Sequence, residues 1–219
     1  MKLVLFDIDG TLVPDASSEM RFARYMWRTG ELGLRQLLAF VWFCVRYFPR
    51  YGRHVMQKNK AYLSGHSRAH VAALARAFVN EELMPALYAP AVERLRAHQQ
   101  AGDHIALLSG TPQFIASALA DALGVAHSFA ALCDMRRDRY TAKPPQRHPY
   151  GPTKIDAAYA LAQQAGLPLS QAIAFGDSIT DAYLFRVVGE AVAVQPDRRL
   201  SEAATGAGWE VMLDRVDRA

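Results

Sequence analysis

Two aspartates separated by one residue, Asp7 and Asp9, lie near the N-terminus of the chain. Four apolar residues (3–6) precede them, which is typical of a short strand buried on both faces of a parallel sheet. Because side chains alternate along a strand, Asp7 and Asp9 point to the same side, and Gly10 lets the chain leave the strand without steric cost. Two carboxylates this close repel each other, and a divalent cation is the simplest compensation. The pair indicates a metal site, with an acidic turn as the alternative.

Polar side chains also follow two later apolar runs, residues 104–108 and 172–175. These polar residues are Ser109, Asp177 and Asp181, and a further candidate, Lys154, begins a predicted helix. Taken singly, each has a simpler explanation as a turn, a helix cap or an exposed lysine. The carboxyl ends of parallel strands meet at one edge of a sheet, where ligands bind. We therefore expect these residues to form one site with the aspartate pair.

The elements that must position this site alternate between strand and helix after residue 85. Apolar runs predict strands at 104–108, 129–132, 172–175, 190–194 and 209–213, and amphipathic patterns predict helices at 91–100, 113–123 and 153–165, with another helix before the last strand. Residues 135–150 are rich in Arg and Pro and predict a hairpin or loop. This alternation predicts an α/β protein, with a Rossmann-like three-layer core around a parallel sheet.

Between the first two predicted strands the pattern is helical only. It predicts helices beginning near Ser18, at 32–47 with a stop at Pro49, at 54–63, and at 67–79 with Ser67 as the cap. We therefore expect a core made of residues 1–13 and 85–219 and an all-helical cap at 14–84. Residues 14–80 hold eleven Lys or Arg against three acids, whereas the remainder holds fourteen against eighteen. The basic insertion is expected to attract an anionic substrate.

The predicted helix at 32–47 contains nine consecutive apolar residues, 37–45, between Arg35 and Arg46. A membrane span needs about twenty, so this run does not predict one. A helix that is apolar all round is expected to pack between other helices, with a dimer contact or a membrane contact as alternatives.

Composition sets further limits on the chain. With 219 residues and 51% hydrophobic content it can bury one substantial core. Cys44 and Cys133 lie far apart without a partner motif, and no signal peptide is visible, so we expect a cytoplasmic protein without disulfides. We expect no nucleic-acid partner and a monomer or a homodimer, and membrane contact is the less favoured interpretation.

The chemical residues, taken together, resemble the four motifs of the haloacid dehalogenase-like (HAD) hydrolase superfamily. The matching segments are Asp7-x-Asp9-Gly10-Thr11, Ser109-Gly110, Lys154, and Gly176-Asp177 with Asp181. The helical insertion after the first motif resembles the cap of subfamily IB, the phosphoserine phosphatase-like proteins. Residues 193–197 and Gly208-Trp209 are similar to that subfamily's C-terminal segments.

This resemblance implies a phosphomonoesterase that forms an aspartyl-phosphate. Asp7 would be the nucleophile and Asp9 the general acid and base, with Ser109 and Lys154 completing the catalytic set. Gly110 and Thr111 would bind the phosphoryl group, and one of the cap arginines, Arg53 among them, would bind the rest of the substrate. The implied cofactor is Mg²⁺, and its expected ligands are Asp7, Asp9, Asp177 and Asp181.

The substrate expected from the resemblance is a small soluble phosphate ester of the amino-acid or amino-alcohol phosphate type. Phosphoserine phosphatases carry a cap glutamate nine positions after the nucleophile, where this chain has Ala16, which argues against phosphoserine itself. Two alternatives stay open: a phosphotransferase or phosphomutase with the same intermediate, and a non-catalytic phosphate- or membrane-binding module. A dehalogenase is less consistent, because it would need neither Asp9 nor the metal cluster.

Overall fold

A parallel six-stranded sheet forms the centre of the computed structural model, which describes residues 1–14 and 17–213. The strand order is β3-β2-β1-β6-β7-β8, and every neighbouring pair is parallel. The strands are β1 (Leu3–Phe6), β2 (His104–Pro112), β3 (His127–Ala131), β6 (Ile173–Gly176), β7 (Glu190–Val194) and β8 (Glu210–Met212). The predicted α/β fold is confirmed, with the first strand at the middle of the sheet.

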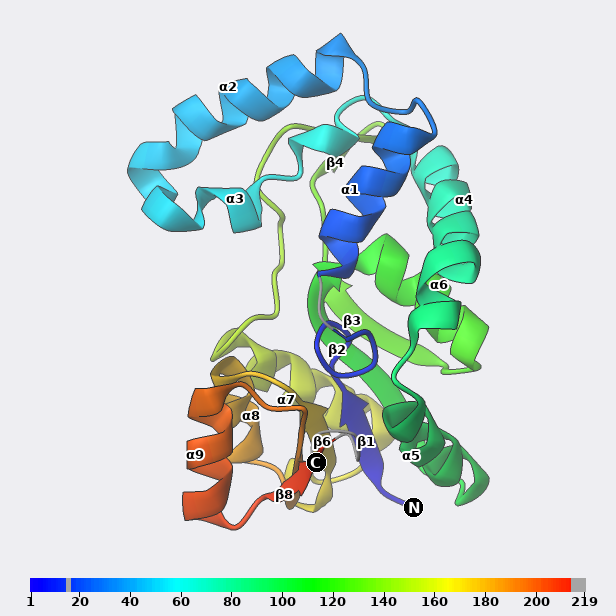
Figure 1. The fold of residues 1–219 in the computed structure, drawn as a ribbon, viewed down its shortest axis with the longest axis vertical. Helices are drawn as coiled ribbons and strands as arrows, with labels where there is room; N and C mark the ends of the chain where they lie inside the picture. The colour runs from blue at the N-terminus through cyan, green and yellow to red at the C-terminus, as the bar shows by residue number, and fades with distance from the viewer. Residues whose placement is uncertain (15–16, 214–219) are drawn as a thin grey trace, which may run out of the picture.

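Both faces of the sheet are covered, because side chains alternate along each strand. Val4 and Phe6 pack into one apolar cluster with α5 (Ala89–Gln100) and α6 (Gln113–Leu123). Leu3 and Leu5 pack into a second cluster on the opposite face. The helices of that second face are α7 (Thr153–Ala165), α8 (Ala182–Phe185) and α9 (Arg198–Ala207). Figure 1 shows these two helical layers on either side of the strands.

The chain between β1 and β2 forms a helical insertion, as expected (Figure 1). Its helices α1 (Ser18–Arg28) and α4 (Arg68–Phe78) pack onto the core, where the Phe22 ring centroid lies 5.3 Å from that of Phe78 and 5.1 Å from that of Phe114. The Ser67 hydroxyl caps α4 by accepting a hydrogen bond from the backbone N–H of His70 at 3.2 Å. A π-turn (Val79–Leu83) and a 3₁₀ turn (Met84–Ala86) lead back to α5.

Two expectations for the insertion were wrong. Helix α2 (Leu34–Tyr51) continues past Pro49 to Tyr51 and is followed by Gly52, whose φ is +50°. Proline at this position lacks only one hydrogen bond of the last turn, so the helix does not have to stop there. The single helix expected at 54–63 is instead a 3₁₀ turn (Gly52–His54), the short helix α3 (Val55–Lys58) and a second 3₁₀ turn (Ala61–Leu63). The break lies at Asn59, whose backbone is extended.

Helix α2 is not sandwiched between other helices, which corrects the expectation for its apolar run. Its inner face packs in a small cluster around Phe43, with Val55 and Ala61. Phe43 is the only fully buried residue of α2, and the opposite face is exposed. Within residues 1–14 and 17–213, no helix has the length and apolar character that a membrane crossing requires.

Two short antiparallel strands, β4 (Met135–Arg136) and β5 (Arg139–Tyr140), form the hairpin expected in residues 135–150. The rest of that segment runs as a loop from the insertion to the start of α7 (Figure 1). The loop carries His148 and Pro149 to within 3.7 Å of a Cβ placed at Gly110. The segment therefore forms a wall of the strand-end edge. The exact limits of the cap at 14 and 84 stay a prediction.

Candidate active site

The first motif and the last motif meet at the carboxyl ends of β1 and β6. Asp7 donates its backbone N–H to the carbonyl of Phe175 at 3.0 Å, which continues the pairing of these two strands. Gly10 has a φ of +80°, and a Cβ at this position would lie 2.0 Å from Asp177 Oδ2. Only glycine therefore lets the loop approach the Asp177 carboxylate so closely. Acidic groups from opposite ends of the chain share one site.

Three carboxylates and one lysine form the centre of this site. Asp7, Asp177 and Asp181 each offer an oxygen within 4.8 Å of the others. The buried Lys154 ammonium lies 2.6 Å from Asp181 Oδ1 and 3.0 Å from Asp7 Oδ1. Lys154 comes from the first turn of α7, as expected. We call these four residues the core cluster.

Asp181 is held by several hydrogen bonds, whereas one carboxylate oxygen of Asp7 has none in the described ranges. Asp181 Oδ2 accepts hydrogen bonds from the backbone N–H groups of Asp177 (3.3 Å) and Ser178 (3.2 Å). A Cβ at Gly176 would lie 2.6 Å from Asp181 Cγ, so glycine is required here for close packing. The contact between Asp7 Oδ1 and Lys154 lacks hydrogen-bond geometry, so this oxygen is buried with no hydrogen-bond partner in the described ranges. Such an oxygen is open to a further ligand.

The carboxyl groups of the core cluster are hard to ionise together. Burial, with repulsion from Asp181 and Asp9, raises the pKa of Asp7 to about 6, although Lys154 opposes the shift. Burial, with repulsion from Asp7 and Asp181, raises the pKa of Asp177 to about 8. Burial would lower the pKa of Lys154, but Asp181 and Asp7 raise it above its ordinary value. One lysine does not neutralise three carboxylates, and a hard divalent cation with oxygen ligands fits this donor set.

Asp9 is oriented differently from Asp7. Its Oδ1 accepts a hydrogen bond from the backbone N–H of Ser18 at 2.7 Å, and its Oδ2 accepts one from the Thr111 hydroxyl at 2.9 Å. The structure does not bring the Asp9 carboxylate into the group of Asp7, Asp177 and Asp181. The predicted role of the Asp9 side chain as a metal ligand gains no support, because its oxygens lie outside the group of carboxylate oxygens that could share an ion.

Ser109, Gly110 and Thr111 lie together at the end of β2, beside the core cluster. Ser109 and Thr111 are buried, and the backbone N–H of Thr111 donates to Ser109 Oγ at 3.3 Å. The Thr111 hydroxyl lies 3.1 Å from Ser18 Oγ and donates to Asp9. Thr111 therefore orients Asp9, and its predicted contact with substrate gains no support from this geometry. Its partner Ser18, at the first turn of α1, was missed in the sequence.

A second group of charges, from the insertion and the 141–150 loop, faces the strand-end edge. The buried Lys60 ammonium pairs with Glu19, which also accepts a hydrogen bond from the Tyr62 hydroxyl at 3.1 Å. Lys58 Nζ lies 3.1 Å from His148 Nδ1. We call Glu19, Lys58, Lys60 and His148 the cap cluster. It has two lysines for one carboxylate.

The two clusters lie close enough to influence each other's charge. Burial and the positive charges of Lys58, Lys60 and Lys154 lower the pKa of His148 to about 3, so this imidazole is neutral at pH 7. Burial raises the pKa of Glu19, and Lys60 opposes the shift. Sequence reasoning missed both cap lysines, because Lys58 ends a short helix and Lys60 comes shortly after it, so neither follows a strand and both resemble exposed lysines. Their burial comes only from the fold.

The predicted contact between Arg53 of the cap and the substrate gains no support from the structure. Arg53 is exposed and donates to its neighbour His54 at 3.3 Å, and the structure does not bring it to the strand-end edge. Arg21, another arginine of the insertion, lies one turn along α1 from Ser18 and has a buried Nη1 with no partner in the described part of the chain. Ala16, the position that argued against phosphoserine, lies outside the described residues.

A second group of possible metal ligands lies in the insertion, at Glu31, His66 and His70. His70 Nε2 is 2.7 Å from Glu31 Oε2, and His66 Nδ1 is 4.0 Å from it. The Gln36 amide nitrogen lies 3.3 Å from His66 Nε2 and can only donate. The hydrogen of a neutral His66 is therefore on Nδ1, the nitrogen that faces Glu31. This arrangement is a hydrogen-bonded network and does not present three free lone pairs to a metal.

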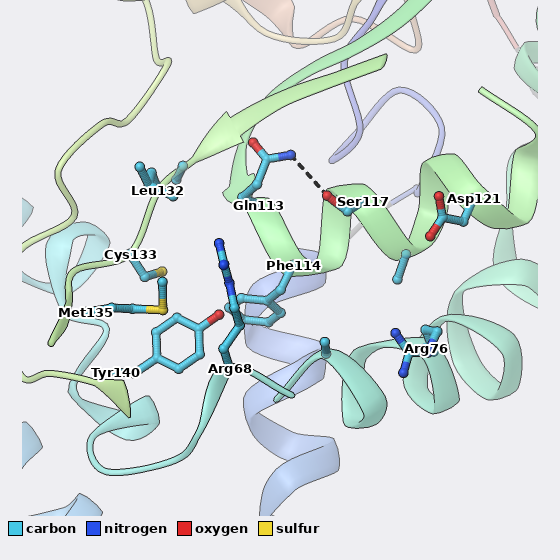
Figure 2. Close-up of a pocket in the computed structure, with 13 residues that line it drawn as sticks. Arg68, Arg76, Gln113, Phe114, Ser117, Asp121, Leu132, Cys133, Met135 and Tyr140 are labelled. Atoms are coloured by element: carbon cyan, nitrogen blue, oxygen red, sulfur yellow. Dashed lines mark hydrogen bonds between the residues drawn. The ribbon is translucent and has the colours of Figure 1, made fainter. Parts of the chain in front are cut away.

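A separate cavity lies outside the core cluster. It has a volume of about 250 Å³ and lies between α4 and α6, as Figure 2 shows. Arg68 and Arg76 come from α4, and Gln113 and Asp121 come from α6. The floor is apolar, and none of the four motifs contributes to it. The reactive groups lie instead at the strand-end edge.

A family comparison agrees with this geometry. Residues 4–186 match the model of the haloacid dehalogenase-like hydrolase family. This range contains all four motifs. Over 212 residues the chain is 30% identical to a probable phosphatase of Mycobacterium tuberculosis, covering 94% of this chain and 73% of that protein. It is 28% identical to a phosphoserine phosphatase of the same organism over 220 residues, covering 97% of this chain and 71% of that protein.

A solved structure has the same overall fold. It is a protein of unknown function from Bordetella pertussis Tohama I, with 29% sequence identity and a TM-score of 0.80. The match covers 97% of this chain and 98% of that one. The helical insertion and the sheet therefore occur together in a related chain.

Proposed function

This chain belongs to the haloacid dehalogenase-like hydrolase family, as one of its phosphatases, and from that premise we propose that it is a Mg²⁺-dependent phosphomonoesterase for a small, soluble phosphate ester. The observation that supports this best is the approach of Asp7, Asp177 and Asp181 around Lys154, with Asp7 Oδ1 left unsatisfied. Ester hydrolysis in this arrangement proceeds in two displacement steps at phosphorus.

In the first step a carboxylate oxygen of Asp7 attacks phosphorus, and the bond from phosphorus to the ester oxygen breaks. Asp9 gives its proton to the departing oxygen, so that an alcohol leaves and an aspartyl-phosphate forms. In the second step Asp9 takes a proton from a water molecule, whose oxygen attacks phosphorus and releases Asp7 and inorganic phosphate. Ser18 and Thr111 hold Asp9 for both transfers, and each Asp9 oxygen keeps a second lone pair for this purpose.

The phosphoryl charge must be balanced while Asp7 approaches it. Lys154 supplies one positive charge 3.0 Å from Asp7, and Ser109 with the backbone N–H of Gly110 offers hydrogen-bond donors at the end of β2. Asp7, Asp177 and Asp181 would hold Mg²⁺, which when bound supplies the charge neutralisation that lets a carboxylate meet a phosphate dianion. The donor set fits this ion, since it consists of oxygens alone.

The cap cluster supports a choice among substrates. Glu19 is already paired with Lys60, so it is not a free partner for a substrate ammonium group. Among the described residues, Lys58 has no carboxylate partner and Nη1 of Arg21 has no hydrogen-bond partner. This excess of positive charge favours an ester with a second anionic group, as in an amino-acid phosphate, over an amino-alcohol phosphate that has none.

The test compares phosphoserine with phosphoethanolamine, which differ only by a carboxylate. Inorganic phosphate release is measured with Mg²⁺ and again with EDTA, and 4-nitrophenyl phosphate serves as a generic ester. We expect release with Mg²⁺ only, and a kcat/KM about tenfold or more higher for phosphoserine, because one charge-assisted contact is involved. Lys58→Gln should remove most of that preference, whereas Lys143→Gln, an exposed lysine of the 141–150 loop, should keep it.

The outcomes separate the parts of the proposal. If no ester releases phosphate with Mg²⁺, the phosphomonoesterase proposal is wrong. If 4-nitrophenyl phosphate is hydrolysed but the two amino compounds react equally, the enzyme stands and the substrate class is wrong. If phosphate appears on an added alcohol or sugar instead of in solution, the chain is a phosphotransferase.

A further inference from the structure

One face of helix α2 is apolar and exposed along its whole length. Leu34, Leu37, Leu38, Val41, Trp42, Val45 and Phe48 make up this face, and each has more than half of its surface exposed, from 53% at Val41 and Trp42 to 74% at Val45. At 100° per residue these positions span an arc of about 140°. Figure 1 shows α2 at the end of the molecule farthest from β8, with no described element beyond it. We call this set the α2 face.

The α2 face is not explained by the packing of the insertion. The inner side of the helix packs on Val55 and Ala61 through Phe43, so the helix is already anchored without the outer residues. Single exposed apolar residues are common on protein surfaces, but a contiguous stripe of seven marks a contact surface. The composition, with Trp and Phe among Leu and Val, matches helices that lie in the headgroup region of a bilayer.

The charges around the face decide between possible occupants. Residues 32–80 contain no Asp or Glu, and they contain eight basic residues. Arg46 lies beside the α2 face, whereas Arg50 lies in the last turn of the helix and Arg53 follows directly after it; all three are exposed. A second copy of the chain across a two-fold axis would place this basic surface against the same basic surface of the other copy, because both copies contribute the same residues. An anionic lipid surface instead offers phosphates to the same arginines.

We propose that the α2 face docks on a membrane surface that contains anionic phospholipids. The helix lies parallel to the bilayer, with its apolar stripe among the upper acyl chains and headgroups and with Arg46 and Arg50 at the phosphate level. Attachment is peripheral and reversible, because it rests on one helix face and a few arginines and not on a membrane span. It concerns a surface apart from the core cluster and does not depend on which ester the site cleaves.

Vesicle co-sedimentation of the full chain tests this. The wild type should bind vesicles of phosphatidylcholine with phosphatidylglycerol and bind vesicles of phosphatidylcholine alone about tenfold more weakly, and added salt should weaken binding to the anionic vesicles. Val45→Glu places a charge in the middle of the face and should reduce binding by about tenfold or more. The matched control is Tyr159→Glu, an exposed apolar side chain on α7, which should bind like the wild type.

A second variant separates charge from apolar contact. Arg46→Gln with Arg50→Gln should lower binding to anionic vesicles toward the level seen with phosphatidylcholine alone. Absence of wild-type binding to anionic vesicles, or equal binding by Val45→Glu, overturns the proposal. Light scattering on the same samples provides a further check: a dimer that Val45→Glu converts to a monomer would mean that the α2 face is a protein interface instead.

Discussion

The core cluster and the cap cluster both bury lysine beside carboxylate, but they carry opposite excess charges. In the core, Asp7, Asp177 and Asp181 share Lys154. In the cap, Lys58 and Lys60 accompany the single carboxylate of Glu19. The core carboxyls consequently have raised pKa values, whereas the pKa of His148 in the cap is lowered. The core cluster therefore lacks positive charge and the cap cluster lacks negative charge. This is the arrangement expected of a metal site that faces a substrate site.

The largest effect is expected from the core cluster, at the nucleophile. Asp7→Asn should lower kcat for any phosphate ester by at least about 10³-fold, because an amide does not form the acyl-phosphate. The variant should fold normally, since it removes one of three repelling charges. Steady-state phosphate release and a thermal melt measure both properties. Asp121→Asn, on the exposed side of α6, is the matched control, and activity retained by Asp7→Asn would mean that the nucleophile is another residue.

The next effect separates Asp9 from the metal-binding carboxylates. Asp9→Asn should lower kcat by about 10²–10⁴-fold for an alkyl phosphate, whose leaving oxygen must be protonated. The first step with 4-nitrophenyl phosphate should be affected far less, because nitrophenolate leaves without a proton. A pre-steady-state burst of nitrophenol measures that step. An equal loss for both esters would assign Asp9 to the metal and not to proton transfer.

The next effect concerns the cap cluster and is expected in the free energy of unfolding. Lys60→Met leaves the Glu19 carboxylate without its buried partner, so the free energy of unfolding should fall by about 3 kcal/mol. Adding Glu19→Gln to the same chain should restore most of the loss, since the uncompensated charge is gone. Urea denaturation measures both variants. Arg198→Met breaks a pair whose arginine is 91% exposed and should leave stability unchanged. A double variant as unstable as Lys60→Met would show that lost packing, not charge, is responsible.

The last prediction concerns the dependence of metal binding on pH. Asp7 and Asp177 have ordinary pKa values of 3.8 and folded values of about 6 and about 8, so the folded state keeps protons that the unfolded state has released. Without metal, stability should therefore fall as the pH rises from about 4 to about 8. Mg²⁺ competes with those protons and should raise the melting temperature more at pH 8 than at pH 5.

Melts in EDTA and in Mg²⁺ at several pH values provide the measurement. The difference should be measurable, since about 1 kcal/mol already moves the midpoint by about 2–4 °C in a chain of this size. Asp177→Asn is the informative variant, because it should reduce both the pH dependence and the response to Mg²⁺. A response to Mg²⁺ that is equal at all pH values would disconnect the ion from these carboxyls.

Much of the core was predictable, because local pattern and sheet geometry agree there. Helices α6 and α7 begin and end where their amphipathic patterns and following glycines predicted, at 113–123 and 153–165. The placement of Asp7 beside Asp177 followed from one rule, that parallel strands end at a common edge. The predictions failed in the insertion, where α2 passes Pro49 and the segment from 54 to 63 breaks at Asn59. No sheet register constrains that region, so tertiary packing decides it.

What the sequence determined by itself is the chemistry of the strand ends: the carboxylates, the lysine, and the glycines that let them approach. The carboxylates and glycines are identified by their position after an apolar run, and the lysine by its place at the start of a predicted helix; both signals are local. What only the tertiary structure decided is the pairing of Glu19 with Lys60, the orientation of Asp9 by Ser18 and Thr111, and the exposure of the α2 face. These depend on which surfaces of separate helices meet, and an apolar or basic side chain has the same letter in the sequence whether it is buried or exposed.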